Sequence, residues 1–266
     1  MRLPEPMGRA LRARRHTALL IAIIALFAVR PFLGDTGPGA IAFSLAILLV
    51  LLMALLAIQV DDLVGEREAL LVQRRRRSFV GWALAVPAVA ERLWVSFAPS
   101  PWLYRVGSVS WLVFFIYVTG SQLRSLLKQR EVTGETISMS ISIYLLLGLC
   151  WGLLYIVIFT RHPEAFSFGT SPGVSEQHMF PIFIYFSLTT LSTIGFGDIT
   201  PLTLQARYAA VAEGITGQFY LAVLVARLVG MQMSRAATPS TSAPAQDRRT
   251  ETPDRGGATI VPRGPA

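Results

Sequence analysis

The stretch most suited to chemistry lies at residues 190–201, which read TLSTIGFGDITP. Gly195 and Gly197 alternate with apolar residues, and Asp198 follows them. Because glycine tolerates a positive φ angle, a chain with glycine at every second position can alternate between the two backbone hands. Successive carbonyl oxygens can then point to one side, and such a ladder can replace the water shell of a dehydrated cation. The Thr193 hydroxyl would add one more oxygen at the end of the ladder.

The string Thr-Ile-Gly-Phe-Gly-Asp at residues 193–198 resembles the signature filter of potassium channels, and a looser resemblance extends over residues 138–232. The resemblance implies that a ring of main-chain carbonyls selects K⁺, with K⁺ as the permeant ion and no organic cofactor. By this resemblance, the carbonyl ligands come from Thr193, Ile194, Gly195 and Phe196. Gly197 and Asp198 support the filter. The family most often has tyrosine in place of Phe196, which lacks the hydroxyl that would tie the filter to surrounding aromatic residues. A Gly-x-Gly pair alone also occurs in ordinary turns, whereas the longer string is much more specific.

An apolar aromatic segment precedes this string at residues 179–192 and is too short to cross a bilayer. Pro181 suits the first turn of a helix, so we expect a re-entrant half-helix followed by irregular backbone that lines a cavity. The C-terminal end of such a helix carries partial negative charge and would favour a cation below the filter. Tyr185 and Phe186 precede Thr193 by eight and seven residues, where the family places an aromatic collar. Ordinary core packing is the alternative for these two rings.

A long apolar segment at residues 202–232 follows the filter, and Thr200-Pro201 is predicted to be its cap and first helical residue. Gly217 lies where the family's inner helix has a hinge glycine, although small-residue helix packing explains it equally well. Glu213 is an acid inside this span; it either hydrogen-bonds behind the pore helix or influences the cavity. Three apolar residues are candidates for a constriction near the inner mouth, namely Leu221, Val225 and Val229.

The composition is that of a membrane protein. Of 266 residues, 53% are hydrophobic and 15% are charged, and the mean hydropathy is +0.52, whereas soluble domains carry about 25% charged residues. The net charge of +8 comes from arginines beside apolar spans and not along one solvated face, so we expect no nucleic-acid partner. Cys150 is the only cysteine and lies in an apolar run; it can form no intrachain disulfide and is interpreted as a small core residue.

Six apolar segments are predicted to cross a lipid bilayer as helices, at residues 17–29, 40–60, 79–97, 106–123, 137–159 and 202–232. The positive-inside rule places the arginine-rich segments that alternate with them in the cytoplasm. We therefore expect a multi-pass protein of the cell membrane, with both termini cytoplasmic and the filter opening outward. The first segment is short for a span, and a cleaved signal peptide competes with the retained helix that we favour.

The predicted fold class is an all-α membrane protein with six transmembrane helices, a re-entrant pore helix and a selectivity-filter loop. The expected parts are a basic cytoplasmic N-terminus at 1–16, a four-helix membrane domain at 17–127, a cytoplasmic linker at 128–136, a pore domain at 137–233 and a disordered cytoplasmic tail at 234–266. Leucines at helical spacing within residues 121–136 predict an interfacial linker helix, which either transmits motion to the pore or is a passive tether.

The four-helix domain lacks the arginine repeat of a voltage sensor. Arg105 and Arg124 lie at the ends of the fourth span, with no arginine at every third position within it. Because steep voltage gating needs several charges per subunit, each worth about 2.3 kcal/mol per 100 mV, we expect weak voltage dependence or none.

Two other charged groups in this domain have two interpretations each. Glu91 and Arg92 lie inside the third span and either face protein or water or extend to the interface. A run of four arginines either contacts anionic lipids or is a solvated cluster that orients the chain, and it consists of Arg74, Arg75, Arg76 and Arg77.

One filter per chain cannot surround an ion, so we expect four subunits to close the ring as a homotetramer with cyclic symmetry, as the resemblance implies. The predicted function is passive, potassium-selective permeation without enzymatic activity. The alternatives are a nonselective cation channel, which the Gly-Phe-Gly-Asp ending disfavours, and a potassium transporter subunit, which would resemble four linked pore repeats. An intramembrane enzyme is disfavoured because the sequence lacks His-Glu-x-x-His, Gly-x-Ser-x-Gly and paired intramembrane aspartates.

Overall fold

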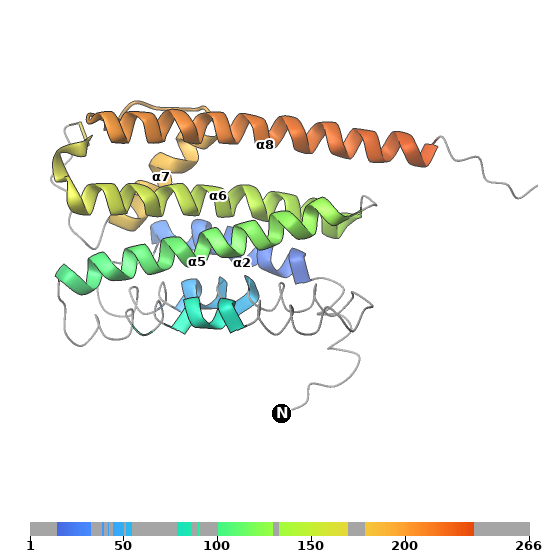
Figure 1. The fold of residues 1–266 in the computed structure, drawn as a ribbon, viewed down its shortest axis with the longest axis horizontal. Coiled ribbons are helices and arrows are strands. Elements are labelled where there is room, and N and C mark those ends of the chain that lie inside the picture. Colours follow the sequence, from blue (N-terminus) through green and yellow to red (C-terminus); the bar gives the residue numbers. More distant parts are fainter. Residues whose placement is uncertain are drawn as a thin grey trace, which may run out of the picture.

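The fold is a set of long helices, seen in a computed structural model that describes residues 15–32, 39, 42, 45–50, 52–54, 79–86, 90, 101–129, 133–169 and 179–236. Its main helices are α2 (Arg15–Val29), α5 (Pro101–Lys128), α6 (Gly134–Arg161), α7 (Met179–Leu191) and α8 (Leu204–Ala236), as Figure 1 shows. Short elements complete these segments: the 3-10 helices η1 (Arg30–Phe32) and η2 (Pro163–Ala165), and the strands β1 (Phe166–Ser167) and β2 (Thr200–Pro201). The expected all-α fold is confirmed.

Three of the described helices are long and apolar enough to cross a membrane, over residues Arg105–Lys128, Gly134–Arg161 and Leu204–Gly230. They correspond to the fourth, fifth and sixth predicted spans. The first predicted span is the shorter apolar helix α2. Most of the second and third spans, the four consecutive arginines, the Glu91-Arg92 pair and the chain after residue 236 lie outside the described residues.

Helices α2 and α6 begin side by side and run in the same direction. The Glu135 carboxylate, in the first turn of α6, accepts hydrogen bonds from the His16 backbone N–H at 3.0 Å and the Thr17 hydroxyl at 2.7 Å. A carboxylate at a helix N-terminus satisfies free N–H groups and complements the positive end of the helix dipole. Further along α2, the apolar residues Leu19 and Ile23 are fully buried in the core.

Helix α5 is longer than the predicted fourth span and runs without a break to Lys128. The separate interfacial helix predicted within residues 121–136 is therefore wrong: its first part continues α5, and α6 already begins at Gly134. Two local features explain the difference. Residues 121–128 contain neither glycine nor proline, so nothing breaks the helix, and a capping box at Thr133 starts α6.

Helix α7 packs between α6 and α8 (Figure 1). It contains 13 residues, and at 1.5 Å per residue it spans about 20 Å, less than the hydrocarbon core of a bilayer. Glycines on α6 permit close packing here, because a Cβ added at Gly148 would lie 2.6 Å from the Leu188 side chain, and one at Gly152 would lie 2.5 Å from that of Ile184. The predicted half-helix therefore forms, and it is held against α6 along its length.

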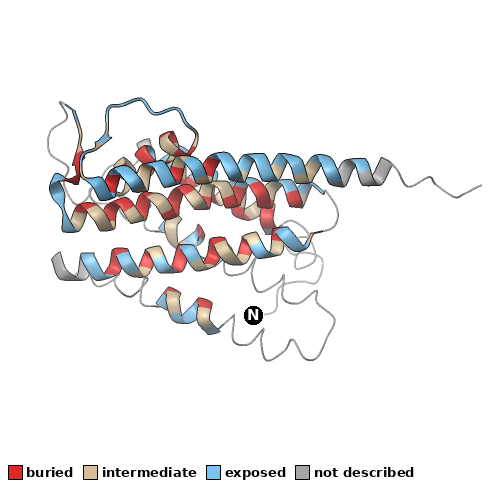
Figure 2. Cartoon of the chain, turned by 45° about the horizontal axis from the view of Figure 1, so that its top comes forward, coloured by how far each residue is buried: buried red, intermediate tan, exposed pale blue. Residues whose placement is uncertain are grey.

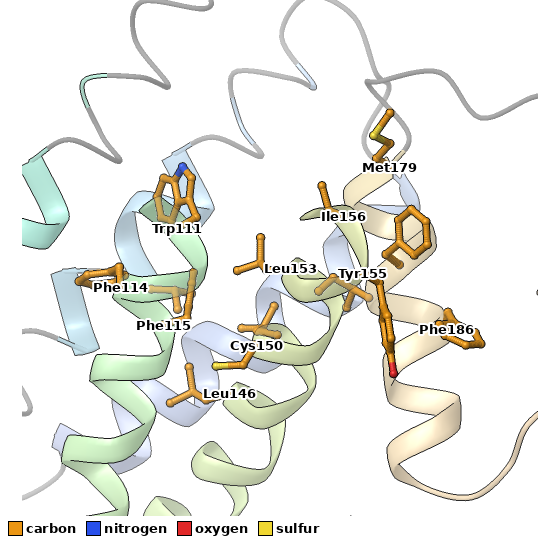
Figure 3. Packing of buried hydrophobic residues seen from close by; sticks show 14 of the residues in the cluster. Trp111, Phe114, Phe115, Leu146, Cys150, Leu153, Tyr155, Ile156, Met179 and Phe186 are labelled. Atoms are coloured by element: carbon orange, nitrogen blue, oxygen red, sulfur yellow. The ribbon is translucent and has the colours of Figure 1, made fainter. Parts of the chain in front are cut away.

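An aromatic cluster fills the space between α6, α7 and β1. The Tyr155 and Phe186 rings meet edge to face with centroids 5.0 Å apart, and Phe183 contacts Phe166 at 5.0 Å and Phe159 at 5.3 Å. Figure 3 shows Tyr155 projecting from α6 toward α7 beside Phe186. These large buried rings hold the half-helix in place from behind.

The segment after the filter differs from its prediction. Thr200 and Pro201 do not begin the inner helix but form β2, which pairs antiparallel with β1 so that Pro201 lies opposite Phe166. The Leu202 N–H donates to the Ala165 carbonyl at 2.8 Å, which extends this connection. Helix α8 then starts at Leu204, and the Ala206 N–H reaches the Thr203 hydroxyl at 3.5 Å. Pairing with β1 takes Thr200 and Pro201 into a strand, and Thr203 instead occupies the capping position at the start of α8.

Candidate ion-conduction site

The filter backbone has the alternating conformation expected from its glycines. Thr193, Gly195 and Gly197 have φ angles of +61°, +53° and +79°, whereas Ile194 and Phe196 between them do not have positive φ. Thr193 is the one non-glycine residue with positive φ in the described part of the chain. Such a conformation is strained for a β-branched residue and persists only where the surroundings enforce it.

Hydrogen bonds to the C-terminal end of α7 enforce this conformation. The Thr193 N–H donates to the Thr190 carbonyl at 3.0 Å, and the N–H groups of Ile194 and Gly195 share the Thr189 carbonyl at 2.8 and 3.1 Å. The backbone N–H groups of residues 193–195 thus all donate to carbonyls at the end of α7. Within the described structure, no backbone N–H donates to the carbonyls of residues 193–196, so these oxygens are free to coordinate an ion.

The filter and the adjacent helix leave much apolar surface uncovered in a single chain. Ile194 and Phe196 expose 58% and 68% of their surface. Figure 2 shows the exposed face of α8 running along its length, and its large apolar side chains include Tyr208, Val211 and Phe219. Contiguous apolar surface of this extent marks contact with lipid or with other protein chains.

The outer end of the filter is anchored by Tyr185. Its ring stacks on Phe196 with centroids 6.2 Å apart and planes 2° from parallel, and its hydroxyl hydrogen-bonds to the Asp198 carboxylate. Phe196 is therefore held by ring stacking, which needs no hydroxyl. The two predicted collar residues have different surroundings, because Phe186 belongs to the buried aromatic cluster behind α7.

Gly217 lies where α8 meets the C-terminal end of α7. A Cβ added there would lie 2.3 Å from the Leu191 carbonyl oxygen, closer than real Cβ atoms approach other atoms. The Tyr144 hydroxyl donates to the same carbonyl at 3.2 Å. Glycine is therefore required at this position by packing; the hinge role stays a prediction.

Glu213, one helical turn before Gly217, is fully buried behind the pore helix. One carboxyl oxygen lies 2.5 Å from the Tyr155 hydroxyl on α6 and the other lies 2.5 Å from the Ser187 hydroxyl on α7. Of the two sequence-based interpretations, hydrogen bonding behind the pore helix is the one observed. The sequence indicated the acid but not its partners, since these hydroxyls have no distinctive pattern of their own.

A further contact joins α8 to the end of α5. The Arg227 guanidinium donates to the Leu127 carbonyl at 2.8 Å and to the Gln129 carbonyl at 2.7 Å. A cation at this end satisfies free carbonyls and complements the negative end of the helix dipole. No sequence pattern predicts this contact. The three predicted constriction residues, Leu221, Val225 and Val229, are exposed on α8.

The alternating filter, the half-helix behind it and the two long apolar helices that flank both define the pore module of an ion channel. Residues 141–233 match the family model described as an ion channel, which agrees with the resemblance of residues 193–198 to the filter of potassium channels. The match begins within α6 and does not include the N-terminal helices. Comparisons with curated proteins and with solved structures found no match. The ion-channel domain and the apolar helices together identify a membrane protein.

Proposed function

We propose that four copies of this chain assemble around a common axis and conduct K⁺ passively across the cell membrane. The observation that carries this proposal is the backbone of residues 193–197, which alternates in hand and leaves its carbonyls without internal partners. Thr193, Ile194, Gly195 and Phe196 would supply the carbonyl ligands, and Thr193 also its hydroxyl. Gly197 and Asp198 would support the outer end of the filter, with Asp198 held by Tyr185.

The free surfaces of a single chain support a homotetramer with cyclic symmetry. The carbonyl oxygens of one chain can occupy only one side of an ion, so the ring requires further copies. The filter residues and the apolar face of α8 are exposed together, and both would be covered by neighbours around a shared axis. The C-terminal end of α7 would then direct its partial negative charge toward a cation in the central cavity.

Selectivity for K⁺ over Na⁺ is proposed because the outer end of the filter is fixed in place. The Tyr185 ring stacks on Phe196 and its hydroxyl binds Asp198, while β2 pairs with β1 just beyond. A filter with so many attachments resists collapse around a smaller ion. We therefore propose a potassium-selective channel and not a nonselective cation channel or a transporter subunit.

The membrane arrangement is proposed as six helices with both termini in the cytoplasm. Helices α2 and α6 run outward in parallel from their shared contact at Glu135, and α5 and α8 would run inward. Arg105 and Arg124 are exposed near the two ends of α5, so this helix carries no buried charge ladder, and we propose weak voltage dependence or none. No step of this permeation requires an enzymatic activity.

Purified protein in liposomes tests the proposal directly. With a K⁺ gradient across the membrane, we expect the chain to carry K⁺ down its gradient, and native mass spectrometry in mild detergent should show tetramers. Protein that stays monomeric, or liposomes no more permeable to K⁺ than protein-free ones, would contradict it.

A further inference from the structure

Four groups from three helices meet around Glu213, and we call them the Glu213 cluster: Tyr155 and Gly148 on α6, Ser187 on α7, and Glu213 on α8. The Ser187 hydroxyl lies 2.5 Å from one Glu213 oxygen and 2.7 Å from the Gly148 carbonyl oxygen. The Tyr155 hydroxyl lies 2.5 Å from the other Glu213 oxygen. The cluster thus contains three hydrogen-bonding contacts, each of which needs its own proton.

Counting protons identifies the state of the carboxyl group. The hydroxyls of Tyr155 and Ser187 supply one proton each, and the Gly148 carbonyl can only accept. An ionised Glu213 also only accepts, so one of the three contacts would then bring two oxygens together without a proton. A protonated Glu213 completes the set: Tyr155 donates to Glu213, Glu213 donates to Ser187, and Ser187 donates to the Gly148 carbonyl.

Burial agrees with this count. Glu213 has 0% of its surface exposed, and no lysine, arginine or histidine in the described structure forms an ion pair with it. An isolated buried carboxylate is costly and normally takes up a proton instead. The titratable groups facing Glu213 are Tyr155 and Tyr144, both from α6, and a phenol carries no charge below about pH 10. The described residues of α7 and α8 add no other titratable group there.

The position of the cluster relates it to conduction. Ser187 lies one turn before Leu191, whose carbonyl is packed against Gly217, and the filter starts two residues later at Thr193. Glu213 and Gly217 are themselves one turn apart on α8. Helix α8 therefore contacts the last turn of α7 at both ends of that turn. Gly217 packs against the Leu191 carbonyl, and the contact of Glu213 with Ser187 depends on a proton.

We propose that Glu213 works as a neutral carboxylic acid that positions the pore helix, and that its ionisation in alkaline solution opens the Glu213 cluster and lowers K⁺ conduction. The conduction part of this inference rests on the proposed function. The hydrogen-bonding part concerns the folded protein alone. An ionised Glu213 leaves the single Ser187 hydroxyl proton to two acceptors, the carboxylate and the Gly148 carbonyl, so one of the contacts that hold α7 in place is lost.

Two substitutions distinguish a Glu213 that acts as a hydrogen-bonding neutral acid from one that only fills space. Glu213→Gln keeps a donor for Ser187 and an acceptor for Tyr155, so we expect K⁺ flux within about twofold of the unchanged protein at pH 7, and no decline up to pH 9. Glu213→Ala leaves two buried hydroxyl groups without their partner, and we expect flux to fall at least about tenfold. The unchanged protein should lose flux toward pH 9. Glu164→Gln, at an exposed acid outside the Glu213 cluster, is the matched control and should keep that pH profile.

Infrared difference spectroscopy provides a readout that does not depend on conduction. The difference spectrum between the unchanged protein and Glu213→Gln should show the C=O band of a protonated carboxyl group at pH 7. This band should disappear at alkaline pH. A difference spectrum with only ionised carboxylate bands at pH 7 would overturn the inference, as would a Glu213→Gln protein that conducts no better than Glu213→Ala. A protein with the protonated band but without K⁺ flux would instead contradict the proposed function.

Discussion

The substitution Gly195→Ala tests whether the alternating filter backbone is needed for conduction. Gly195 has a φ angle of +53°, and a Cβ built on it meets no other atom within 4 Å. Within one chain the cost of alanine is therefore confined to the backbone, about 1–2 kcal/mol for a left-handed L-residue. In the proposed tetramer the four copies add up to about 4–8 kcal/mol. Even the lower value reduces the population of intact filters about a thousandfold.

The structure offers a closely matched control for this experiment. Gly169 has a φ angle of +59°, and its added Cβ would lie at an ordinary 3.5 Å from the Asp198 carbonyl oxygen. Gly169→Ala should therefore carry the same backbone cost per subunit, but outside the filter. In a K⁺ flux assay on liposomes with equal amounts of tetramer, we expect Gly195→Ala to be inactive and Gly169→Ala to remain active. Normal flux through Gly195→Ala would refute the filter assignment, and equal losses in both variants would show that flux reports only general strain.

Two other predictions concern the contacts of α8. Gly217→Ala places a methyl group 2.3 Å from the Leu191 carbonyl oxygen. We expect this to cost about 1–3 kcal/mol per subunit and to lower the melting temperature of the tetramer. An unchanged melting temperature would show that α7 and α8 separate easily here. Arg227→Gln removes the cation from the end of α5. We expect single-channel recordings of this variant to show a changed open probability at unchanged conductance. A changed conductance would instead place Arg227 in the ion path.

The pore module could be predicted from sequence because its conformation is set locally. Glycine at every second position determines where φ can be positive, and the observed angles at Gly195 and Gly197 follow that pattern. The apolar composition of residues 179–192 predicts the extent of the half-helix. Helix α7 begins at the predicted residue and ends one residue before the predicted end. The sequence also singles out Gly217, although its packing against the Leu191 carbonyl depends on where α7 lies relative to α8.

The remaining features depend on contacts between distant segments. Tyr155 is 58 residues from Glu213, and Arg227 is 100 residues from Leu127; neither pair has a periodicity that would reveal it. The start of the inner helix was misplaced because Thr200-Pro201 has the composition of a helix cap, while pairing with β1 makes it a strand. In each of these places tertiary contacts override a local preference.

Potassium selectivity is tested most directly by the reversal potential of the reconstituted protein with K⁺ on one side of the membrane and Na⁺ on the other. A carbonyl ring formed by residues 193–196 predicts at least a hundredfold preference for K⁺, which displaces the reversal potential by at least about 120 mV, since each tenfold step contributes about 59 mV for a single charge. The current should also disappear in Gly195→Ala. A reversal potential near zero, with a current that Gly195→Ala leaves intact, would contradict the account.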